Sequence, residues 1–308
     1  MSKSINTYTE PLTESQVEKL RTLLDDRGFE FVEKPYAIYS GKKGKLNVTV
    51  YEKGPKVLVQ GKETADFVQF TLEPEILGEA KLGYEEIHQP EMFEPHIGVD
   101  ESGKGDFFGP LVIAGAYVDA EISRHLLDQG IMDSKRITSD ARIRNLSDLI
   151  RSVPGIAWEI VQINPGRYNE LYDQFGNLNR MLAWGHATVI ENVLAKRPEC
   201  PRALSDQFAN PSELIRALQK KGKSIEVQQR TKAESDVAVA AASILAREAF
   251  IDWIDDTGEH LEVEIPKGAS AKVKETGKLI VENQGAGILN EIAKVHFRTA
   301  DEILDENS

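Results

Sequence analysis

Residues 96–118 read HIGVDESGKGDFFGPLVIAGAYV, and this stretch determines how the chain from residue 96 onward is expected to fold. Its first part is apolar and ends on two adjacent acids, Asp100 and Glu101, and a second apolar run follows at 110–118. Apolar runs on either side of a glycine-rich turn predict neighbouring strands. Because burying two adjacent carboxylates is costly, we expect these acids to lie in solvent or beside a cation.

Further strand-like runs follow at 155–163, 203–206 and 224–230, with helical patterns between and after them. Those patterns cover 138–152, a long segment across 166–196, 211–221 and 232–256. Early strands joined by short turns, followed by strands that alternate with helices, predict a mixed sheet with helices on both faces. The fold class is therefore α/β.

The composition of the 308-residue chain excludes several classes of protein. One cysteine, Cys200, rules out an internal disulfide and fits a reducing compartment. The N-terminus is polar, and the longest apolar runs are too short to cross a bilayer. The net charge of −13 argues mildly against a nucleic-acid partner, although the distribution of charge matters more than its sum.

The first 88 residues predict a small unit of their own. Thr13 and Gln16 have capping-box spacing at the start of a helix that Gly28 ends. Three strand-like runs follow, FEFVEKPYAIYS at 29–40, LNVTVYEK at 46–53 and KVLVQG at 56–61, and then a second helical pattern over 62–77. The acidic stretch 79–96 has no strong periodicity. We expect an N-terminal α+β domain over 1–88, a linker over 89–95 and a second domain over 96–308.

Positive charge is concentrated between residues 29 and 62, where seven lysines outnumber three glutamates. Three tyrosines are interleaved with them. Lysines and tyrosines on a sheet can hold a sugar-phosphate backbone, but lysines also protect solvated edge strands from aggregation. The sequence alone leaves both explanations open. The residues concerned are Lys34, Lys42, Lys43, Lys45, Lys53, Lys56 and Lys62, with Tyr36, Tyr39 and Tyr51.

Two more acids end elements that otherwise look buried. Asp206 closes the run ALSD, and Glu234 begins the alanine-rich helix. Ligands and catalysts are commonly presented at strand ends in α/β sheets. Carboxylates that converge there repel one another unless divalent cations bind. Mg²⁺ favours such oxygen ligands, and two ions about 4 Å apart can promote phosphodiester hydrolysis.

Each of these residues also has a purely structural explanation. Asp206 would cap the segment that follows it, and Thr231 with Glu234 has capping-box spacing. Asp236 competes with Glu234 as a fourth acid, because helical residues two apart point about 200° apart and only one can face the site. His186 is interpreted as a histidine satisfied within its helix. The segment Asp133-Ser134-Lys135 is interpreted as a turn and helix cap.

The motifs taken together are more specific than any one of them. GVDESGKGDFFGPLVIAGAYV, DSKRIT, ALSDQF and KAESDVAVAAASILAREAF occur in this order. This combination resembles the type 2 ribonucleases H, and within them ribonuclease HIII of bacteria, over residues 95–300. The sister group, ribonuclease HII, has Gly-Arg-Gly where this chain has Gly103-Lys104-Gly105, and its fourth acid is usually Asp where this chain has Glu234.

The resemblance implies a ribonuclease H-like mixed five-stranded sheet flanked by helices, and a TATA-binding-protein-like N-terminal domain. It implies an endoribonuclease that cleaves the RNA strand of RNA–DNA hybrids and leaves 5′-phosphate and 3′-hydroxyl ends. The acidic quartet of the family, with two Mg²⁺ or Mn²⁺ ions, falls on Asp100, Glu101, Asp206 and Glu234. Substrate contacts are expected from Gly103, Lys104, Gly105, Ser134, Lys135, Lys42, Lys43 and Lys45.

We therefore expect a cytoplasmic monomer that binds RNA–DNA hybrid and no membrane. Three alternatives stay open at this point. The chain could be a ribonuclease HII with an unusual N-terminus, a binding module with an inactive nuclease centre, or a small-molecule phosphatase or nucleotidyl transferase. The intact quartet argues against the second, and the lack of a P-loop argues against the third.

Overall fold

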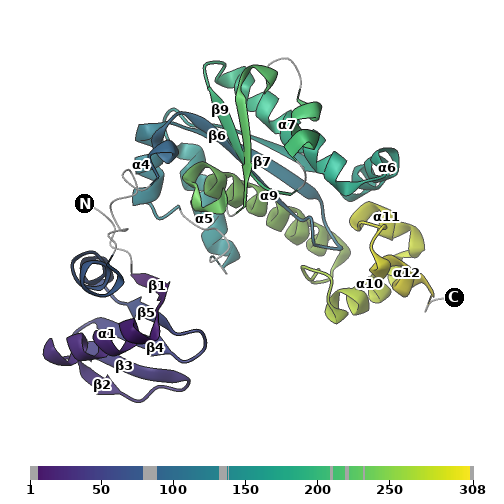
Figure 1. The fold of residues 1–308 in the computed structure, drawn as a ribbon. Coiled ribbons are helices and arrows are strands. Elements are labelled where there is room, and N and C mark those ends of the chain that lie inside the picture. The colour runs from purple at the N-terminus through teal and green to yellow at the C-terminus, as the bar shows by residue number, and fades with distance from the viewer. Residues whose placement is uncertain are drawn as a thin grey trace. The chain divides into compact units, whose positions relative to one another are not determined.

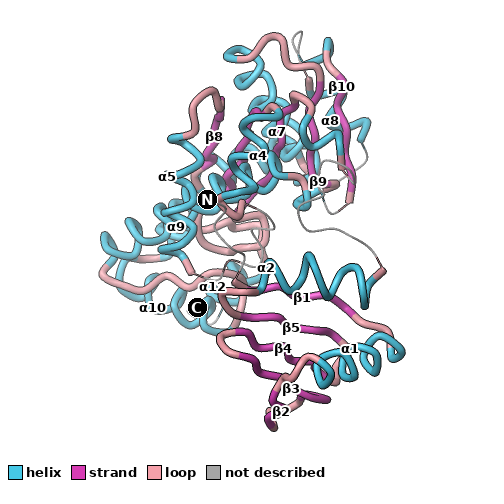
Figure 2. Tube along the Cα trace, turned by 90° about the vertical axis from the view of Figure 1, so that its left-hand side faces the viewer, coloured by secondary structure: helices cyan, strands magenta, loops and turns pink. Residues whose placement is uncertain are grey.

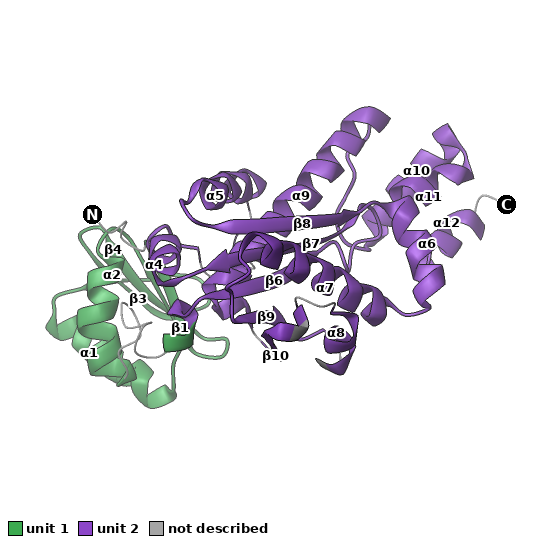
Figure 3. Ribbon diagram, turned by 90° about the horizontal axis from the view of Figure 1, so that it is seen from above, with its two compact units in different colours: residues 1–91 green, residues 92–308 purple. Residues whose placement is uncertain are grey.

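The computed structural model describes residues 6–78, 89–131, 137, 139–208, 211–218, 222–231 and 233–305. The chain divides into two compact units, residues 1–91 and 92–308 (Figure 3). This boundary lies inside the segment predicted as a linker. No helix of the described residues is long and apolar enough to cross a membrane.

The first unit contains a five-stranded antiparallel sheet in the order β1-β5-β4-β3-β2 (Figure 2). Its helices are α1 and α2, and the π-helix η1 continues α2. The elements in chain order are β1 (Thr7–Pro11), α1 (Glu14–Asp26), β2 (Glu30–Val32), β3 (Ala37–Lys43), β4 (Leu46–Tyr51), β5 (Lys56–Gln60), α2 (Thr64–Phe67) and η1 (Val68–Leu77).

Local sequence explains how this unit folds. The predicted capping box is present, because Thr13 and Gln16 exchange side-chain and backbone hydrogen bonds at the start of α1. Leu20 and Leu24 of α1 are fully buried against alternate residues of the strands, such as Val48 and Val50 of β4. The sheet therefore has one face covered by the helices of this unit and an opposite face, called here the open face.

Two features of the first unit were not predicted from the sequence. Strand β1 has no apolar alternation and is defined by its pairing with β5, which the sequence around it does not reveal. The run predicted as one strand over FEFVEKPYAIYS is divided into β2 and β3. The break contains Tyr36, whose φ of 62° lies in the left-handed region and ends strand geometry.

The second unit is built on a five-stranded mixed sheet in the order β10-β9-β6-β7-β8. Strands β6, β7 and β8 are antiparallel neighbours, whereas β9 and β10 run parallel to β6 and to each other. All five predicted strands are confirmed. Their bounds are β6 (His96–Ser102), β7 (Leu111–Val118), β8 (Ala157–Ile163), β9 (Arg202–Asp206) and β10 (Glu226–Arg230).

Helices cover both faces of this sheet, as predicted (Figure 1). Helix α9 (Val237–Leu261) lies on one face and α7 (Leu178–Lys196) on the other. On the α9 face, a Cβ at Gly98 would lie 2.2 Å from backbone atoms of α9, so β6 and α9 touch through their main chains. On the α7 face, a Cβ at Gly115 would collide with Val189.

The remaining helical elements differ from the sequence pattern in two respects. The segment predicted as one helix over 166–196 is α6 (Pro165–Phe175) and α7, because Gly176 adopts a φ of 61° and ends α6. The helix over Ala120–Asp128 and the C-terminal helices were not predicted. The other elements are η2 (Pro90–Phe93), α4 (Ala120–Asp128), α5 (Asp140–Ser152), α8 (Pro211–Ala217), η4 (Gly222–Ser224), η5 (Ala233–Ser235), α10 (Ala271–Gln284), η6 (Ala286–Ile288), α11 (Leu289–Ile292) and α12 (Arg298–Asp305).

Candidate active site

The candidate site forms where the central strand β6 extends past its neighbour β9. Pairing between the two strands covers Ile97 to Val99 on β6, and β9 ends at Asp206. Asp100 and Glu101 follow directly, still paired with β7 on the other side. The two acids therefore lie at an opening in the sheet rather than within its buried middle.

Asp100 points to the α9 face and is partly buried. Burial, together with the neighbouring Glu101 carboxylate, raises the pKa of Asp100 to about 6, although hydrogen bonds from Ser243 and the Glu101 backbone oppose the shift. An ionised Asp100 is thus unfavourable in the folded chain at neutral pH. A cation beside it would relieve that cost.

We expect Asp100→Asn to stabilise the metal-free protein. A folded pKa of about 6 against an ordinary 3.8 means that stability is lost as pH rises from about 4 to 6. Above that window the loss amounts to about 3 kcal/mol at ~1.4 kcal/mol per pKa unit, and an Asn avoids it. Thermal melts in EDTA at pH 7.5 and pH 4 would measure this, with the exposed Asp256→Asn as the matched control. A stability gain of equal size at both pH values would contradict the assignment.

Glu101 points to the opposite face, because successive strand residues alternate. Its Oε2 lies 3.0 Å from Nε2 of the fully buried His186 on α7, and its Oε1 lies 3.4 Å from Nζ of Lys104. Burial acts to raise the pKa of Glu101, but His186 and Lys104 outweigh it and hold that pKa below its usual range. This carboxylate is therefore the ionised member of the adjacent pair.

His186 also links the two strands that carry the acids. Its Nδ1 lies 3.1 Å from Oγ of Ser205, and that hydroxyl donates to the backbone carbonyl of Asp206 at 2.9 Å. The histidine is satisfied, as predicted, but its partner is a residue of the candidate site rather than its own helix. Sequence reasoning missed this role, and the signal for it was a histidine among the apolar residues that form the buried face of α7.

Asp206 and Glu234 lie together on the α9 side of the sheet. Oδ1 of Asp206 accepts a hydrogen bond of 3.3 Å from the backbone N–H of Ala233, the residue before Glu234. Asp206 therefore binds the η5 turn through Oδ1. Its expected capping of the segment that follows falls partly on residues 209–210, which lie outside the described residues. Glu234 lies in that turn, partly exposed, and precedes α9.

Asp236, the rival acid, has a structural role. It is the N-cap of α9, accepting from the backbone N–H groups of Ala238 and Val239, and it is fully buried. Both of its carboxylate oxygens contact Nε2 of His96, at 2.9 and 3.1 Å. The predicted capping box at Thr231 and Glu234 is therefore wrong. The predicted reason for separating the two acids also fails, because neither residue lies within the helix.

The loop after the acid pair contains three of the predicted substrate-binding residues. Gly103 is required by packing, because its φ is 84° and a Cβ would lie 2.1 Å from the Pro110 carbonyl. Gly105 has open space where a Cβ would be. Lys104 is 38% exposed. Two further predicted residues, Ser134 and Lys135, lie outside the described residues.

The lysines between residues 29 and 62 do not all lie on one face of the sheet of the first unit. Lys42 and Lys56 are on the open face, where Tyr51 pairs with Lys56 across β4 and β5. Lys43 is on the helix-covered face, and its Nζ donates to the Arg27 carbonyl at 2.7 Å. Tyr39 is buried with its hydroxyl on the Val17 carbonyl, so it cannot stack on a ligand.

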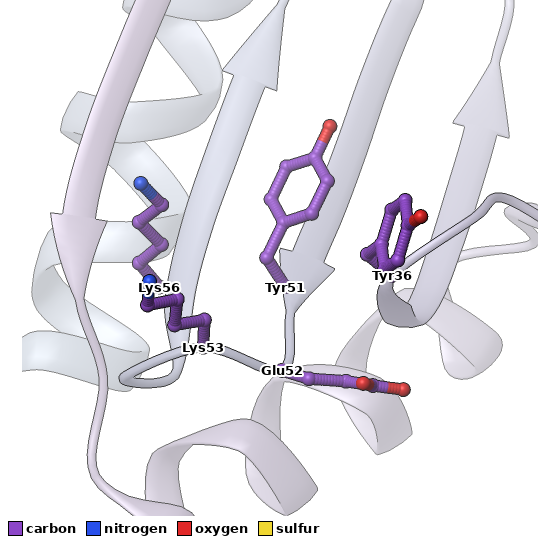
Figure 4. Close-up of a pocket in the computed structure, with 5 residues that line it drawn as sticks. All are labelled: Tyr36, Tyr51, Glu52, Lys53 and Lys56. Carbon is purple, nitrogen blue, oxygen red and sulfur yellow. The ribbon is translucent and has the colours of Figure 1, made fainter.

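Five residues form a shallow hollow of about 340 Å³ in the first unit (Figure 4). Figure 4 shows the ring of Tyr51 between Lys56 on one side and Tyr36 on the other. Tyr36 is 83% exposed, and Glu52 and Lys53 complete the hollow. Lys45 is also exposed, in the turn between β3 and β4.

The carboxylates of the site suit a hard divalent cation. In the part of the chain that the structure describes, no three His, Cys, Asp or Glu side chains are grouped closely enough to hold a metal ion by themselves. Mg²⁺ does not need such a cage, since one or two carboxylates with waters and a substrate phosphate hold it. The raised pKa of Asp100 and the oxygen-only donor set therefore fit this kind of ion.

Comparisons with known proteins agree with this geometry. Residues 97–300 match the family model Ribonuclease HII. The chain is 44% identical to ribonuclease HIII of Protochlamydia amoebophila, over 93% of each chain, and 43% identical to that of Chlamydia felis, over 98% of each. The solved structure of Bst-RNase HIII in complex with Mn²⁺ is similar with a TM-score of 0.67 and 27% identity, covering 97% of this chain and 98% of that one.

The fold and the matched model define the class as type 2 ribonuclease H. Within that class, the chain belongs to the ribonuclease HIII family. Members of this family are hydrolytic endoribonucleases that cleave the RNA strand of RNA–DNA hybrids.

Proposed function

We propose that Asp100, Glu101, Asp206 and Glu234 are the catalytic acids of this chain and that they act on the RNA strand of an RNA–DNA hybrid with Mg²⁺ or Mn²⁺. The observation that carries the proposal is the opening beside β6, where Asp100 and Glu101 lie next to the last residue of β9, Asp206. Divalent cations bound there would activate water and stabilise the leaving 3′-oxygen, giving 5′-phosphate and 3′-hydroxyl ends.

The four acids and His186 have different roles in this proposal. Asp100 and Asp206 offer oxygen ligands from the same side of the sheet, and Glu234 lies beside Asp206 across the Ala233 hydrogen bond. His186 fixes the orientation of Glu101 through its Nε2 contact. A histidine that holds a carboxylate in this way presets the geometry of the site before any ligand enters.

Recognition of the RNA strand is assigned to the loop that follows the acids. The open space at Gly105 permits close approach of a sugar to the main chain. Backbone N–H groups of Gly103 and Gly105 would bond a 2′-hydroxyl, the group that distinguishes RNA from DNA. Lys104, which is 38% exposed, would meet a phosphate, as would Ser134 and Lys135.

The first unit supplies a second contact with the substrate in this proposal. Its open face combines Lys42 and Lys56 with the Tyr51 ring, and Lys45 lies at its margin. A cationic sheet face with an accessible ring suits a sugar-phosphate backbone. This local charge explains how a chain with a net charge of −13 can bind a polyanion. A TATA-binding-protein-like character for residues 1–88, and a cytoplasmic monomer, remain predictions.

We expect the double variant Lys42→Gln/Lys56→Gln to weaken hybrid binding and flatten its salt dependence. Each lost phosphate contact lowers the slope of log affinity against log salt by about 0.9 for duplex DNA, so two contacts change it by roughly two units. Affinity is measured from low to moderate salt with Ca²⁺ to block turnover. The matched control is Lys43→Gln, on the helix-covered face, which should leave the slope unchanged. Equal slopes for all three proteins would mean that the open-face lysines are a solvated surface only.

One gel assay tests the proposed function directly. A uniform RNA–DNA hybrid is incubated with the protein and Mg²⁺, Mn²⁺ or EDTA, and duplex DNA and a single ribonucleotide in duplex DNA serve as comparison substrates. Metal-dependent cleavage of the hybrid RNA is expected. Strong cleavage at the single ribonucleotide would favour ribonuclease HII-type specificity, and no cleavage of any RNA would favour a binding module.

A further inference from the structure

A lysine buried in the second unit contacts the loop that follows the first two acids. Lys294 follows α11 and is fully buried, which is rare for a lysine. Its Nζ donates to the carbonyl of Asp106 at 2.9 Å and to the carbonyl of Gly109 at 2.6 Å. Both carbonyls belong to the loop between β6 and β7, which starts at Gly103, two residues after Glu101.

The backbone around Lys294 holds the same loop. The N–H of Lys294 donates to the Phe107 carbonyl, and the N–H of Gly109 donates to the Ile292 carbonyl, both at 2.9 Å. Phe108 forms an isolated antiparallel bridge with Ala293. The C-terminal segment thus pairs with the far end of the loop for a few residues, and the Lys294 side chain completes the contact.

The other side of the loop is fixed by a third segment. The N–H of Gly268 donates to the Asp106 carboxylate at 2.5 Å, and the Phe107 N–H donates to the Gly268 carbonyl at 2.9 Å. Phe107 is fully buried. These contacts leave Lys104 and Gly105 as the part of the loop that faces outward, next to the buried Gly103.

We infer that Lys294 is a positioning residue for the reaction, because its buried amino group holds the loop that carries Gly103 and Gly105 in the conformation that meets the RNA strand. The inference rests on the proposed function for the use of that loop. Backbone carbonyls in a loop have no hydrogen-bond donor from a neighbouring strand. A long side chain with several N–H groups can therefore donate to two such carbonyls at once.

The electrostatics of the pocket are compatible with this role. Burial lowers the pKa of Lys294 to about 7, and the charge of Asp106 opposes that shift. The neutral amine still has two N–H groups, so both carbonyl contacts survive deprotonation. The ring of Tyr168 lies 5.5 Å from Nζ and favours the charged form. The contact is therefore expected to persist across neutral pH.

The experiment compares Lys294→Met with Lys294→Gln, and uses Lys272→Met as the matched control. Met removes every donor, Gln keeps an N–H group on a shorter side chain, and Lys272 is an exposed lysine paired with Glu264. For proteins that melt cooperatively, kcat and KM are measured on a uniform hybrid, and affinities for hybrid and for duplex DNA are measured in Ca²⁺.

The expected result is a fall in kcat of roughly tenfold or more for Lys294→Met, since small displacements of a positioned group slow reactions strongly. The preference for hybrid over duplex DNA should fall with it, and Lys294→Gln should recover part of both. A purely structural role would lower the melting temperature and leave kcat and the preference of the folded protein unchanged. That outcome would overturn the inference.

Hydrogen exchange keeps the inference testable if Lys294→Met does not fold. In Lys294→Gln, amides of 103–109 should exchange faster than in the wild type, and amides of β8 should not change. Unchanged exchange in the loop would also overturn the inference. If the wild type fails to cleave any hybrid, the proposed function fails by itself, and the exchange comparison still reports whether Lys294 holds the loop.

Discussion

Replacing Asp206 by Asn is expected to slow hybrid cleavage by roughly 1000-fold, a barrier increase of about 4 kcal/mol at 1.36 kcal/mol per factor of ten. The substitution removes the charge of a proposed metal ligand but almost no volume. The hydrogen bond from the Ala233 N–H can still form to the Asn carbonyl oxygen. The loss should therefore appear in the chemical step and not in the fold.

Two measurements separate the chemical effect from a structural one. Hybrid affinity of Asp206→Asn in Ca²⁺ and its melting temperature in EDTA should both stay close to the wild type. Single-turnover cleavage in Mg²⁺ and Mn²⁺ then gives the rate. Cleavage at a near wild-type rate would remove Asp206 from the proposed quartet.

The second large effect concerns substitutions of Glu234 and Asp236, which lie two residues apart. One substitution should reduce cleavage and the other should reduce stability. Glu234→Gln is expected to lose cleavage and keep stability. Asp236→Asn is expected to lose about 3 kcal/mol of stability, because it leaves His96 buried without its charged partner. For a unit of this size, that loss lowers the melting temperature by about 8 °C. An Asn can still cap α9, so the helix start should survive.

The stability that the Asp236 carboxylate contributes should depend on pH. Burial acts to raise the pKa of Asp236, but His96 and two backbone N–H groups outweigh it, and the pKa is lowered. The stability that Asp236 contributes is thus present above pH 4 and is lost as the pH falls further. The difference in the free energy of unfolding between the wild type and Asp236→Asn should therefore become smaller in acid. If only Asp236→Asn loses cleavage at temperatures where both variants are folded, the assignment of Glu234 is wrong.

The strands of the second unit were predictable because their apolar runs are short and bounded by glycine-rich or polar turns. Strand β1 was not predictable, since apolar and polar side chains do not alternate along it. Its place in the sheet depends on pairing with β5, almost fifty residues later in the chain. The division of one predicted helix into α6 and α7 depends on the left-handed backbone at Gly176. A helical pattern on both sides of a glycine does not reveal that conformation.

The candidate site follows a similar rule. Acids at strand ends were visible in the sequence, because each interrupts an apolar run. The side chains that contact the site from afar were not, since His186 lies 85 residues from its partner Glu101, and Lys294 lies 188 residues from Asp106 in the loop after the acids. The division of the lysines between two sheet faces also required the register of β3 and β4, which a bulge between Ala37 and Tyr39 shifts.

The main-chain contact at Gly98 affects how much the site can vary. Where β6 meets α9, any side chain on Gly98 would drive the start of the helix away, and the η5 turn with Glu234 immediately precedes that start. A spacing held by two backbones has no rotamer with which to adjust. The gap between the acids of the strand and Glu234 is therefore a fixed dimension of the protein, and substitutions elsewhere can change how it is filled more easily than how wide it is.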